Sequence, residues 1–521
     1  MTVTKLLAPI LAASLLLVVG CSDDDDDGDG AAPTTSTTAA ASPGPDGATG
    51  DCDGSVDSPD PRFVVDDCGR VVILRGVNVE SSAKGNAQSD RHLPASDVDD
   101  QEALGRWGWN TVRFLVFWGA IEPEPDRYDE AYLDEVETWL DWYADHDVHV
   151  VLDLHQDLYG WAVNGDGAPD WAVDTGGLEV QGIEEGQPWY LQGADPAVQA
   201  AYQSFWNPAD GDTRLQDHYL GALAHLTARF ADHPAVLGVD IMNEPSFANG
   251  DLAATFAIQP QAAVGEFHND NLTAFTNRAI DAVRSASDDL YVFFEPTSLI
   301  NYFPYPGDLI EADIRDPRDG APRLVYAGHL YEPSVHDGHG YPEESTYVAD
   351  WEGYRTAEAE ELQAALWFGE WGGAPDQDRM DEFVAEVLDL SDRTMTGWSW
   401  WSWDPGGWSP VEGDGTTISA NGERLLRVQP RAVAGTPTGF EWDADATVFH
   451  LRWDERAEAV GDTELSVPAS LFADGIEVVL DGDAVADPVW DRDAGVLRVS
   501  PARSLGAHDV CVAPAGSGAC T

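Results

Sequence analysis

The sequence of 521 residues predicts a (β/α)8 TIM barrel of the α/β class, followed by a C-terminal β-sandwich domain. Three observations predict the barrel. Eight apolar runs of strand composition occur between residues 71 and 403, amphipathic helical segments lie between several of them, and nearly every run ends in a polar or aromatic residue. Strands that alternate with helices pair in parallel, and eight can close into a ring. An open, doubly wound sheet is the alternative, but polar strand ends gathered around one mouth favour the barrel.

The predicted barrel elements follow one another along residues 51–425. The predicted strands are Val71–Val79, Thr111–Trp118, Val148–His155, Val236–Glu244, Leu290–Pro296, Leu324–Tyr331, Leu366–Glu370 and Thr396–Trp403. Apolar residues at helical spacing predict helices over Glu130–Asp145, Leu215–Ala231, Leu272–Ala286 and Arg379–Leu390. The residues that end the strands are Asn78, Trp118, His155, Glu244, Glu295, Tyr331, Glu370 and Trp403.

The texture of the sequence changes after about Leu425. Short β-rich segments, Thr447–Trp453, Ile476–Leu480 and Val496–Val499, are separated by turn residues and not by helices. Residues 426–521 are therefore expected to form a small β-sandwich. Packing against the barrel is its expected role, with sugar binding as the alternative.

The first fifty residues have the composition of a targeting segment. Residues 1–20 carry Lys5, then a short Leu/Ala/Val stretch that ends in Val-Val-Gly before Cys21, which is the pattern of a bacterial lipoprotein signal peptide. An ordinary secretory peptide followed by a chance cysteine is the alternative. Residues 21–50, an Asp run followed by Ser, Thr, Ala, Pro and Gly, are expected to be a tether. We therefore expect a protein anchored by lipid at the extracellular face of the bacterial cell membrane, or secreted.

The remaining cysteines form two local pairs. In an exported protein, Cys52 with Cys68 and Cys511 with Cys520 are expected to form disulfides, with free thiols as the alternative. Both pairs lack the close spacing and the histidine partners of a zinc site. No metal and no cofactor is expected.

The charge of the chain excludes one class of function. The formal net charge is −67, whereas a nucleic-acid binder needs a basic surface. We interpret the acidic residues as a solvated surface, and no obligate protein partner is inferred. After the signal peptide Lys84 is the only lysine, so either chance or a function preserves it.

Two glutamates at strand ends predict the chemistry. Glu244 follows Asn243 and precedes Pro245, and Glu370 ends another apolar run. Carboxyl groups that face one pocket can act as acid/base and nucleophile in glycosidic cleavage, with retention of configuration when they lie roughly 5–5.5 Å apart. An isolated Asn-Glu-Pro is usually a loop turn, but the matching Glu370 favours a catalytic pair. Asn243 is expected to hold a sugar 2-hydroxyl.

These residues resemble the retaining glycosidases of glycoside hydrolase family 5, and among them the endoglycoceramidases. The resemblance rests on the segments Asp153–Gly160 (DLHQDLYG), Gly165–Ala172 (GDGAPDWA), His329–Tyr331 and Arg427–Gly435, and it spans about Val71 to the C-terminus. It implies that Glu244 is the acid/base and Glu370 the nucleophile. It also implies that the sugar contacts are Lys84, His155, Asp157, Asn243 and Tyr331.

Side-chain chemistry supports these assignments independently. His155 and Asp157 can offer a donor and an acceptor to adjacent hydroxyls, unless they are a satisfied histidine and a helix cap. Tyr331 can donate to the nucleophilic carboxylate or be a rim aromatic. Arg113 can stabilise the Glu370 anion, because an arginine in a barrel strand needs a buried partner.

The other candidates have supporting or stacking roles. His329 is expected to bridge the catalytic groups or to have a structural hydrogen-bonding role, and Glu295 is expected to support them. Strand alternation places Trp401 and Trp403 on one face, and both are candidate platforms for sugar rings, with core packing as the alternative.

Two long loops bear on substrate choice. The stretch from Gln156 to about Gln216 is long and aromatic, with Trp161, Trp171, Trp189, Tyr190, Phe205 and Trp206, and the insertion Ser246–Asp270 includes Phe247, Leu252, Phe256 and Ile258. These loops could line an apolar slot for a lipid aglycone, or pack together and cap the cleft.

The favoured function is a retaining endo-glycosidase that cleaves glycosphingolipids between glycan and ceramide, with a glycolipid as substrate. A family 5 β-glycanase acting on glucan or mannan, and a non-catalytic glycan-binding surface lipoprotein, are the alternatives.

Overall fold

The computed structural model describes residues 52, 56–85, 92–183, 189–208, 211–246, 265, 267–302, 313–404, 407–500 and 505–520. The predicted signal peptide, the lipidation site Cys21 and the tether lie outside these residues, as do Phe247, Leu252, Phe256 and Ile258 of the second insertion. Within the described ranges, no helix has the length and apolar composition needed to cross a bilayer.

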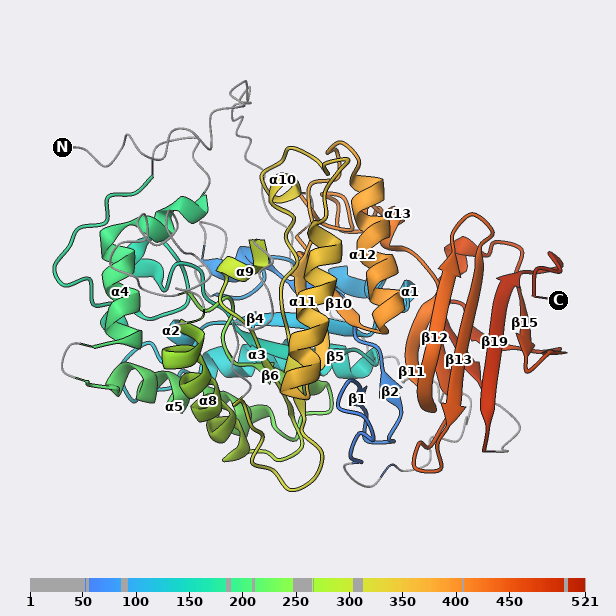
Figure 1. The fold of residues 1–521 in the computed structure, drawn as a ribbon, viewed down its shortest axis with the longest axis horizontal. Helices are drawn as coiled ribbons and strands as arrows, with labels where there is room; N and C mark the ends of the chain where they lie inside the picture. The colour runs from blue at the N-terminus through green and yellow to red at the C-terminus, as the bar shows by residue number, and fades with distance from the viewer. Residues whose placement is uncertain are drawn as a thin grey trace, which may run out of the picture. The chain divides into compact units, whose positions relative to one another are not determined.

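Eight parallel strands close into the predicted barrel. The strands are β3 (Arg75–Val79), β4 (Thr111–Val116), β5 (His149–Leu154), β6 (Val236–Asp240), β7 (Tyr291–Phe294), β8 (Leu324–Tyr326), β9 (Ala365–Trp371) and β10 (Gly397–Trp400). They pair in chain order, and β10 pairs with β3 to close the ring. Figure 1 labels β4, β5, β6 and β10 of these strands. Because no edge remains open, the barrel prediction is confirmed and the open sheet is excluded.

The helices lie mainly between the barrel strands. Their bounds are α1 Glu102–Arg106, α2 Trp118–Ile121, α3 Glu130–Asp145, α4 Pro196–Trp206, α5 Arg214–Phe230, α8 Thr273–Arg284, α9 Leu299–Tyr302, α10 Pro333–His336, α11 Tyr347–Leu362, α12 Met380–Thr394 and α13 Ala420–Leu425. Local chemistry sets several starts: the Asp129 carboxylate accepts from the first amides of α3, and Asp195 caps α4, which begins at Pro196. The four predicted helices correspond to α3, α5, α8 and α12.

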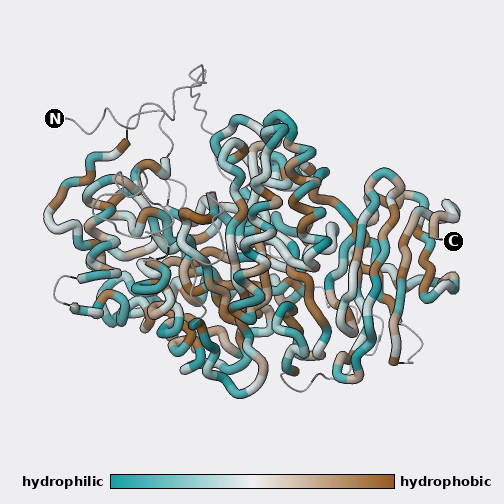
Figure 2. Tube along the Cα trace, in the orientation of Figure 1, coloured by the Kyte–Doolittle hydropathy of each residue, from teal (hydrophilic) through white to brown (hydrophobic). Residues whose placement is uncertain are grey.

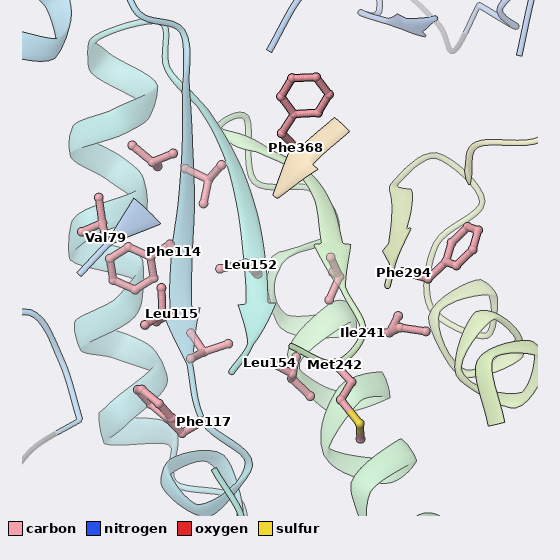
Figure 3. Packing of buried hydrophobic residues seen from close by; sticks show 14 of the residues in the cluster. Val79, Phe114, Leu115, Phe117, Leu152, Leu154, Ile241, Met242, Phe294 and Phe368 are labelled. Carbon is pink, nitrogen blue, oxygen red and sulfur yellow. The ribbon is translucent and has the colours of Figure 1, made fainter. Parts of the chain in front are cut away.

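The barrel core forms between strands and helices. Phe114 of β4 and Leu152 of β5 are completely buried, and Phe114 contacts Trp139 and Tyr143 of α3. Figure 3 shows these strand side chains together with Leu154 and Met242. Each fully buried side chain of this size contributes roughly 1.5–3 kcal/mol, so the rim is carried on a rigid scaffold.

The first predicted strand is divided between two domains. Only residues 75–79 of the run Val71–Val79 enter the barrel as β3, because Val71–Val72 form β2. This strand pairs with β1 (Val64–Val65) and with β11 (Gln429–Val433) of the C-terminal domain. Both strands are fully buried, Arg75 and Asn78 included, and the two residues between the strands, Ile73 and Leu74, are apolar and buried as well. The sequence pattern therefore could not show where the chain changes sheet.

The C-terminal residues form most of two antiparallel sheets, as predicted, and β1 and β2, from the range assigned to the barrel, complete one of them. One contains β1, β2, β11 (Gln429–Val433), β14 (Thr463–Ser466), β18 (Val496–Val499) and β17 (Val489–Asp491), and the other contains β12 (Gly435–Asp443), β13 (Val448–Glu455), β19 (Ala507–Pro514), β15 (Ile476–Leu480) and β16 (Asp483–Ala484). Figure 2 shows hydrophobic and hydrophilic residues alternating along these strands, which suits sheets buried on one face. Both predicted disulfides, Cys52–Cys68 and Cys511–Cys520, are present.

Buried charges tie the barrel to the sandwich. Arg75 of β3 donates through Nη2 to Asp392 of α12 over 2.8 Å and through Nη1 to Gln429 of β11 over 3.1 Å. Arg431 of β11 donates to the carbonyl oxygens of Gly108 and Trp109. The sandwich thus packs against the end of the barrel at which its strands begin, opposite the rim that carries the predicted site residues.

Candidate active site

The two predicted catalytic glutamates meet at the carboxyl end of the barrel. Glu244 follows β6 by four residues, and Glu370 is the penultimate residue of β9. One carboxylate oxygen of each lies within 4.8 Å of the other and of a ring nitrogen of His329. This approach suits a retaining pair, because inverting carboxyl groups lie roughly 6.5–9.5 Å apart to admit a water.

Glu370 is held as a carboxylate. Its Oε1 accepts from Arg113 Nη1 over 2.7 Å, and its Oε2 accepts from the Tyr331 hydroxyl over 2.9 Å. Burial works to raise the pKa of Glu370, but the positive charges of His329, Arg113, His155 and Lys84 outweigh it and lower that pKa below its usual value. An ionised, oriented carboxylate is what a nucleophile requires.

Glu244 is held from its backbone and from one side of its carboxyl group. Its Oε1 contacts His329 Nδ1 at 2.9 Å and accepts from Asn301 Nδ2 over 3.1 Å. The residue has φ +40°, in the left-handed region that non-glycine residues rarely adopt, and its N–H donates to Glu295 Oε2 over 3.0 Å. Gln156 Nε2 donates to its carbonyl oxygen over 2.9 Å. Such strain persists only where neighbours over-determine the backbone.

Arg113 is the centre of a buried charge network. Its guanidinium is completely buried. Besides Glu370 it contacts three carboxylates and two side-chain amides, those of Asp153, Asp240, Glu295, Asn78 and Asn243. Taking one guanidinium out of water is tolerated because its donors find acceptors. The predicted support for the Glu370 anion is present in this geometry.

A second polar cluster lies beside the pair. Lys84, in the 3-10 helix Ser81–Lys84, donates to Asp157 Oδ2 over 2.5 Å, and His155 Nε2 lies 3.7 Å from the same oxygen. The other ring nitrogen of His155 lies 2.7 Å from Asp153. Burial and Lys84 work to lower the pKa of His155, but Asp153 and Asp157 raise it to about 9. The Lys84 and His155 charges hold the pKa of Asp157 well below its usual range against the effect of burial. The cluster presents fixed donors and an acceptor, as sugar hydroxyls require.

The two tryptophans predicted to stack on sugar rings, Trp401 and Trp403, differ in their exposure to solvent. Trp401 is partly exposed, its ring stacks on His155 with centroids 5.6 Å apart, and Lys84 Nζ lies 4.3 Å from its centroid. Trp403 is completely buried and packs against Trp107, so the prediction that it stacks on sugar is wrong. Strand β10 ends at Trp400, and strict alternation does not extend to residue 403.

Asn243 is largely engaged by the protein. Its Oδ1 accepts from Arg113 over 2.8 Å, and its Nδ2 donates to the Gln156 carbonyl over 3.1 Å. Since an amide nitrogen carries two hydrogens, one hydrogen is available for a sugar hydroxyl.

The aromatic residues of the first insertion divide between packing and exposure. Phe205 and Trp206 are buried and contact each other and Phe275 of α8. Trp189 is 45% exposed, and Tyr190 donates to Asp337. Phe205 and Trp206 therefore pack into the core, and they also line a small apolar pocket beside His155 and Gln156.

Sequence reasoning missed several contributors. Asp153 lies within β5 and Asp240 ends β6, each directly after apolar residues, and this signal could have identified them. Gln156 lies within the segment Asp153–Gly160, and its contacts with the carbonyl oxygens of Asn243 and Glu244 could not be predicted from that segment. Asn301, in α9, contacts Glu244 only because the folded barrel brings the two residues together, and no local sequence pattern indicates this contact.

Three groups of acidic and histidine side chains in the described residues are compact enough for an ion: Glu122 with Asp126 and His218, His155 with Asp157 and Asp166, and Glu244 with His329 and Glu370. In the last two, Lys84 and Arg113 already supply positive charge, which opposes a bound cation. The chemistry of the site needs only acids, bases and donors.

Comparisons with known proteins agree with this geometry. The family described as "Cellulase (glycosyl hydrolase family 5)" matches residues 72–407, and the "Glycoside hydrolase family 5 C-terminal domain" matches residues 427–512. Endoglycoceramidase I of Rhodococcus hoagii is 28% identical over 84% of this chain and 85% of its own length. Endo-glycoceramidase II from Rhodococcus sp. was solved with ganglioside GM3, with TM-score 0.77 and 32% identity over 87% of this chain and all of that one. It was also solved as a lactosyl-enzyme intermediate, with TM-score 0.75, 32% identity and the same coverage. The chain is a glycoside hydrolase and belongs to glycoside hydrolase family 5.

Proposed function

We propose that this protein is a retaining endo-glycosidase that cleaves the bond between glycan and ceramide in glycosphingolipids. The observation that carries the proposal is the pair Glu244 and Glu370, with oxygens within 4.8 Å, beside the cluster of Lys84, His155 and Asp157. The substrate class is supported by the endoglycoceramidases among the relatives, one of them solved with ganglioside GM3.

Each catalytic group has a role in the first step. The Glu370 carboxylate attacks the anomeric carbon, while protonated Glu244 gives its proton to the glycosidic oxygen. The bond between the anomeric carbon and that oxygen breaks, and the oxygen leaves with the lipid. The products are a glycosyl ester on Glu370 and a free alcohol. Arg113 and Tyr331 hold the nucleophile in its ionised form until it attacks.

The second step reverses these roles. Glu244, now a carboxylate, removes a proton from water, and the resulting oxygen attacks the anomeric carbon from the face that the lipid left. The ester bond breaks, Glu370 regains its negative charge and Glu244 regains its proton. Two inversions give net retention.

Lys84, His155, Asp157 and Trp401 are proposed to bind the sugar. The lysine and the aspartate are paired with each other, so hydroxyl groups meet oriented donors and acceptors without a conformational change. The partly exposed indole of Trp401 offers a flat face for a sugar ring.

The location of the protein is also a proposal. The predicted lipoprotein signal, Cys21 and the acidic tether support a lipid anchor at the outer face of the cell membrane. An anchored enzyme would meet glycolipids where they lie. Metabolic labelling of the expressed protein with a fatty-acid analogue, compared with Cys21→Ala, tests the anchor.

Mass spectrometry of the products from a defined ganglioside tests the function. We expect intact oligosaccharide and intact ceramide, with the β-anomer of the sugar appearing first. Because the family description includes cellulases, soluble β-glucan and mannan belong in the same assay. Release of reducing sugar from these polymers alone would replace the proposal with a β-glycanase, and Glu244→Gln should abolish turnover in either case.

A further inference from the structure

The two oxygens of the Glu244 carboxyl group have different surroundings. In the described part of the chain, the contacts of its carboxyl group with His329 Nδ1 and Asn301 Nδ2 both fall on Oε1. An amide nitrogen can only donate, so Oε1 must accept from Asn301. Oε2 is therefore the oxygen that can carry the labile proton toward a leaving group.

The protonation state of the His329 ring decides whether the proton of Glu244 lies on Oε2. If Nδ1 carries a hydrogen, Oε1 accepts a second hydrogen bond and the proton of Glu244 stays on Oε2. If Nδ1 is bare, it can accept a proton from Oε1, and the acid then points away from the substrate. The tautomer and charge of one buried ring thus set the direction of proton donation.

Glu295 contacts the opposite side of that ring. Its Oε1 lies 3.1 Å from His329 Nε2, in an ion pair too bent for a regular hydrogen bond. The same oxygen accepts from Arg113 Nη2 over 2.9 Å, and Oε2 accepts from the main-chain N–H of Glu244 over 3.0 Å. Burial raises the pKa of Glu295 to about 8 against the charges of His329 and Arg113. Its hydrogen bonds nevertheless fit the carboxylate form, because a guanidinium and an amide can only donate.

We propose that Glu295 is a positioning residue for the acid/base: its carboxylate keeps His329 doubly protonated, so that Nδ1 donates to Glu244 Oε1 and the catalytic proton lies on Oε2. The inference rests on the proposed function. Glu295 also fixes the left-handed backbone of Glu244 through its second oxygen. One carboxylate thus controls both the position of the Glu244 side chain and the oxygen that carries its proton.

The charges around His329 agree with a protonated ring. It faces Glu244 after β6, Glu295 after β7, Glu370 of β9 and, farther away, Asp240 of β6, with Arg113 of β4 as the opposing cation. Burial works to lower the pKa of His329, but the negative charges of Glu295 and Glu370 outweigh it and raise that pKa well above its ordinary value. The ring also keeps a carboxylate partner when Glu370 is esterified, because Glu244 is then ionised.

Glu295→Gln tests the proposal with two β-lactosides that differ in their leaving groups. A ceramide or simple alkyl lactoside needs acid assistance, whereas a 2,4-dinitrophenyl lactoside does not. We expect kcat/KM for the alkyl substrate to fall by about 10- to 100-fold, with its alkaline limb at lower pH, because the neutral ring forms more readily. For the dinitrophenyl substrate we expect a fall of less than about threefold.

Glu358→Gln is the matched control. Glu358 of α11 is as buried as Glu295, accepts from Tyr326 over 2.8 Å and pairs with Arg355 over 2.9 Å, outside the barrel and away from the site. Its replacement removes a buried carboxylate without touching His329. We expect kcat/KM to be unchanged for both substrates.

The outcomes separate the two proposals. Wild-type protein that hydrolyses neither lactoside contradicts the proposed function. Wild-type activity on both, with equal losses or no loss in Glu295→Gln, contradicts the role of Glu295 alone. If Glu295→Gln does not fold, His329→Gln must give the same selective loss with the alkyl substrate, and an equal loss on both substrates overturns the inference.

Discussion

The hydroxyl group of Tyr331 donates to Glu370 Oε2 over 2.9 Å, directly opposite the bond from Arg113 to Oε1. The carboxylate is thus held at both oxygens, one by a fixed charge and one by a neutral donor. In the covalent intermediate one of these oxygens becomes part of an ester, so the two donors have different consequences for the two steps.

Replacement of Tyr331 by phenylalanine should lower kcat by about 10- to 100-fold, because a hydrogen bond to a charged group contributes roughly 1.5–3 kcal/mol. Stopped-flow measurement with an activated lactoside should place the loss in the formation of the glycosyl-enzyme. Tyr341→Phe is the control, since its hydroxyl donates to Glu386 over 2.6 Å. Equal losses in both variants would contradict the assignment.

Lys84 should set the acid limb of the pH profile. Its charge is one of those that depress the pKa of Glu370, so the nucleophile remains ionised below its ordinary pKa and activity is lost only as the pH falls through the depressed value. Lys84→Met should move the acid limb of kcat/KM to higher pH, whereas Lys84→Arg should leave it in place. If the acid limb of Lys84→Met does not move, the charge of Lys84 does not lower the pKa of Glu370.

His155 should make stability depend on alkaline pH. Its folded pKa of about 9 lies above the ordinary value of 6.5, so its stabilising charge is fully present below about pH 6.5 and is lost as the pH rises through 9. The shift corresponds to about 3 kcal/mol. The Tm advantage of wild type over His155→Gln should shrink between pH 6 and pH 10. A constant advantage would mean that the ring is not charged in the folded protein.

Trp401 and Trp403 should respond differently to truncation. Trp403→Ala leaves a cavity in the core and should cost about 3–5 kcal/mol in the free energy of unfolding. Trp401→Ala should change stability little and raise KM, because its partly exposed ring is proposed to bind sugar. Urea unfolding and steady-state kinetics of both variants measure this. A raised KM with normal stability in Trp403→Ala would restore it as a platform.

Much of the fold was predictable because barrel strands are buried on both faces. The run Val148–His155 is continuous, and β5 (His149–Leu154) lies within one residue of it. Strands β6, β8 and β10 end three to five residues before their predicted runs do, because the chain leaves the sheet before the last residues of those runs. The prediction failed at Val71–Val79, where the chain passes from one buried sheet to another without a polar residue between them.

The site was predictable where function and strand ends coincide. Glu244 and Glu370 could be identified because a carboxylate after an apolar strand must face the rim. The roles of Asn301 and Glu295 depend on which residues the closed barrel brings to His329, and spacing along the chain does not encode this. Trp403 was assigned by alternation beyond the end of its strand, where side-chain direction depends on the local turn.

The pairing of β2 with β11 has a consequence for how this enzyme can be divided or recombined. The segment that leads into the catalytic barrel and the segment that leaves it are neighbours in one sheet. A gene truncated after residue 425 would remove β11 and leave β2 paired with β1 alone, and the edge of β2 that β11 covers would then favour aggregation. Domain exchange between homologous enzymes should therefore transfer residues 56–72 together with residues 426–521. These two segments are far apart in the chain but belong to the same sheet.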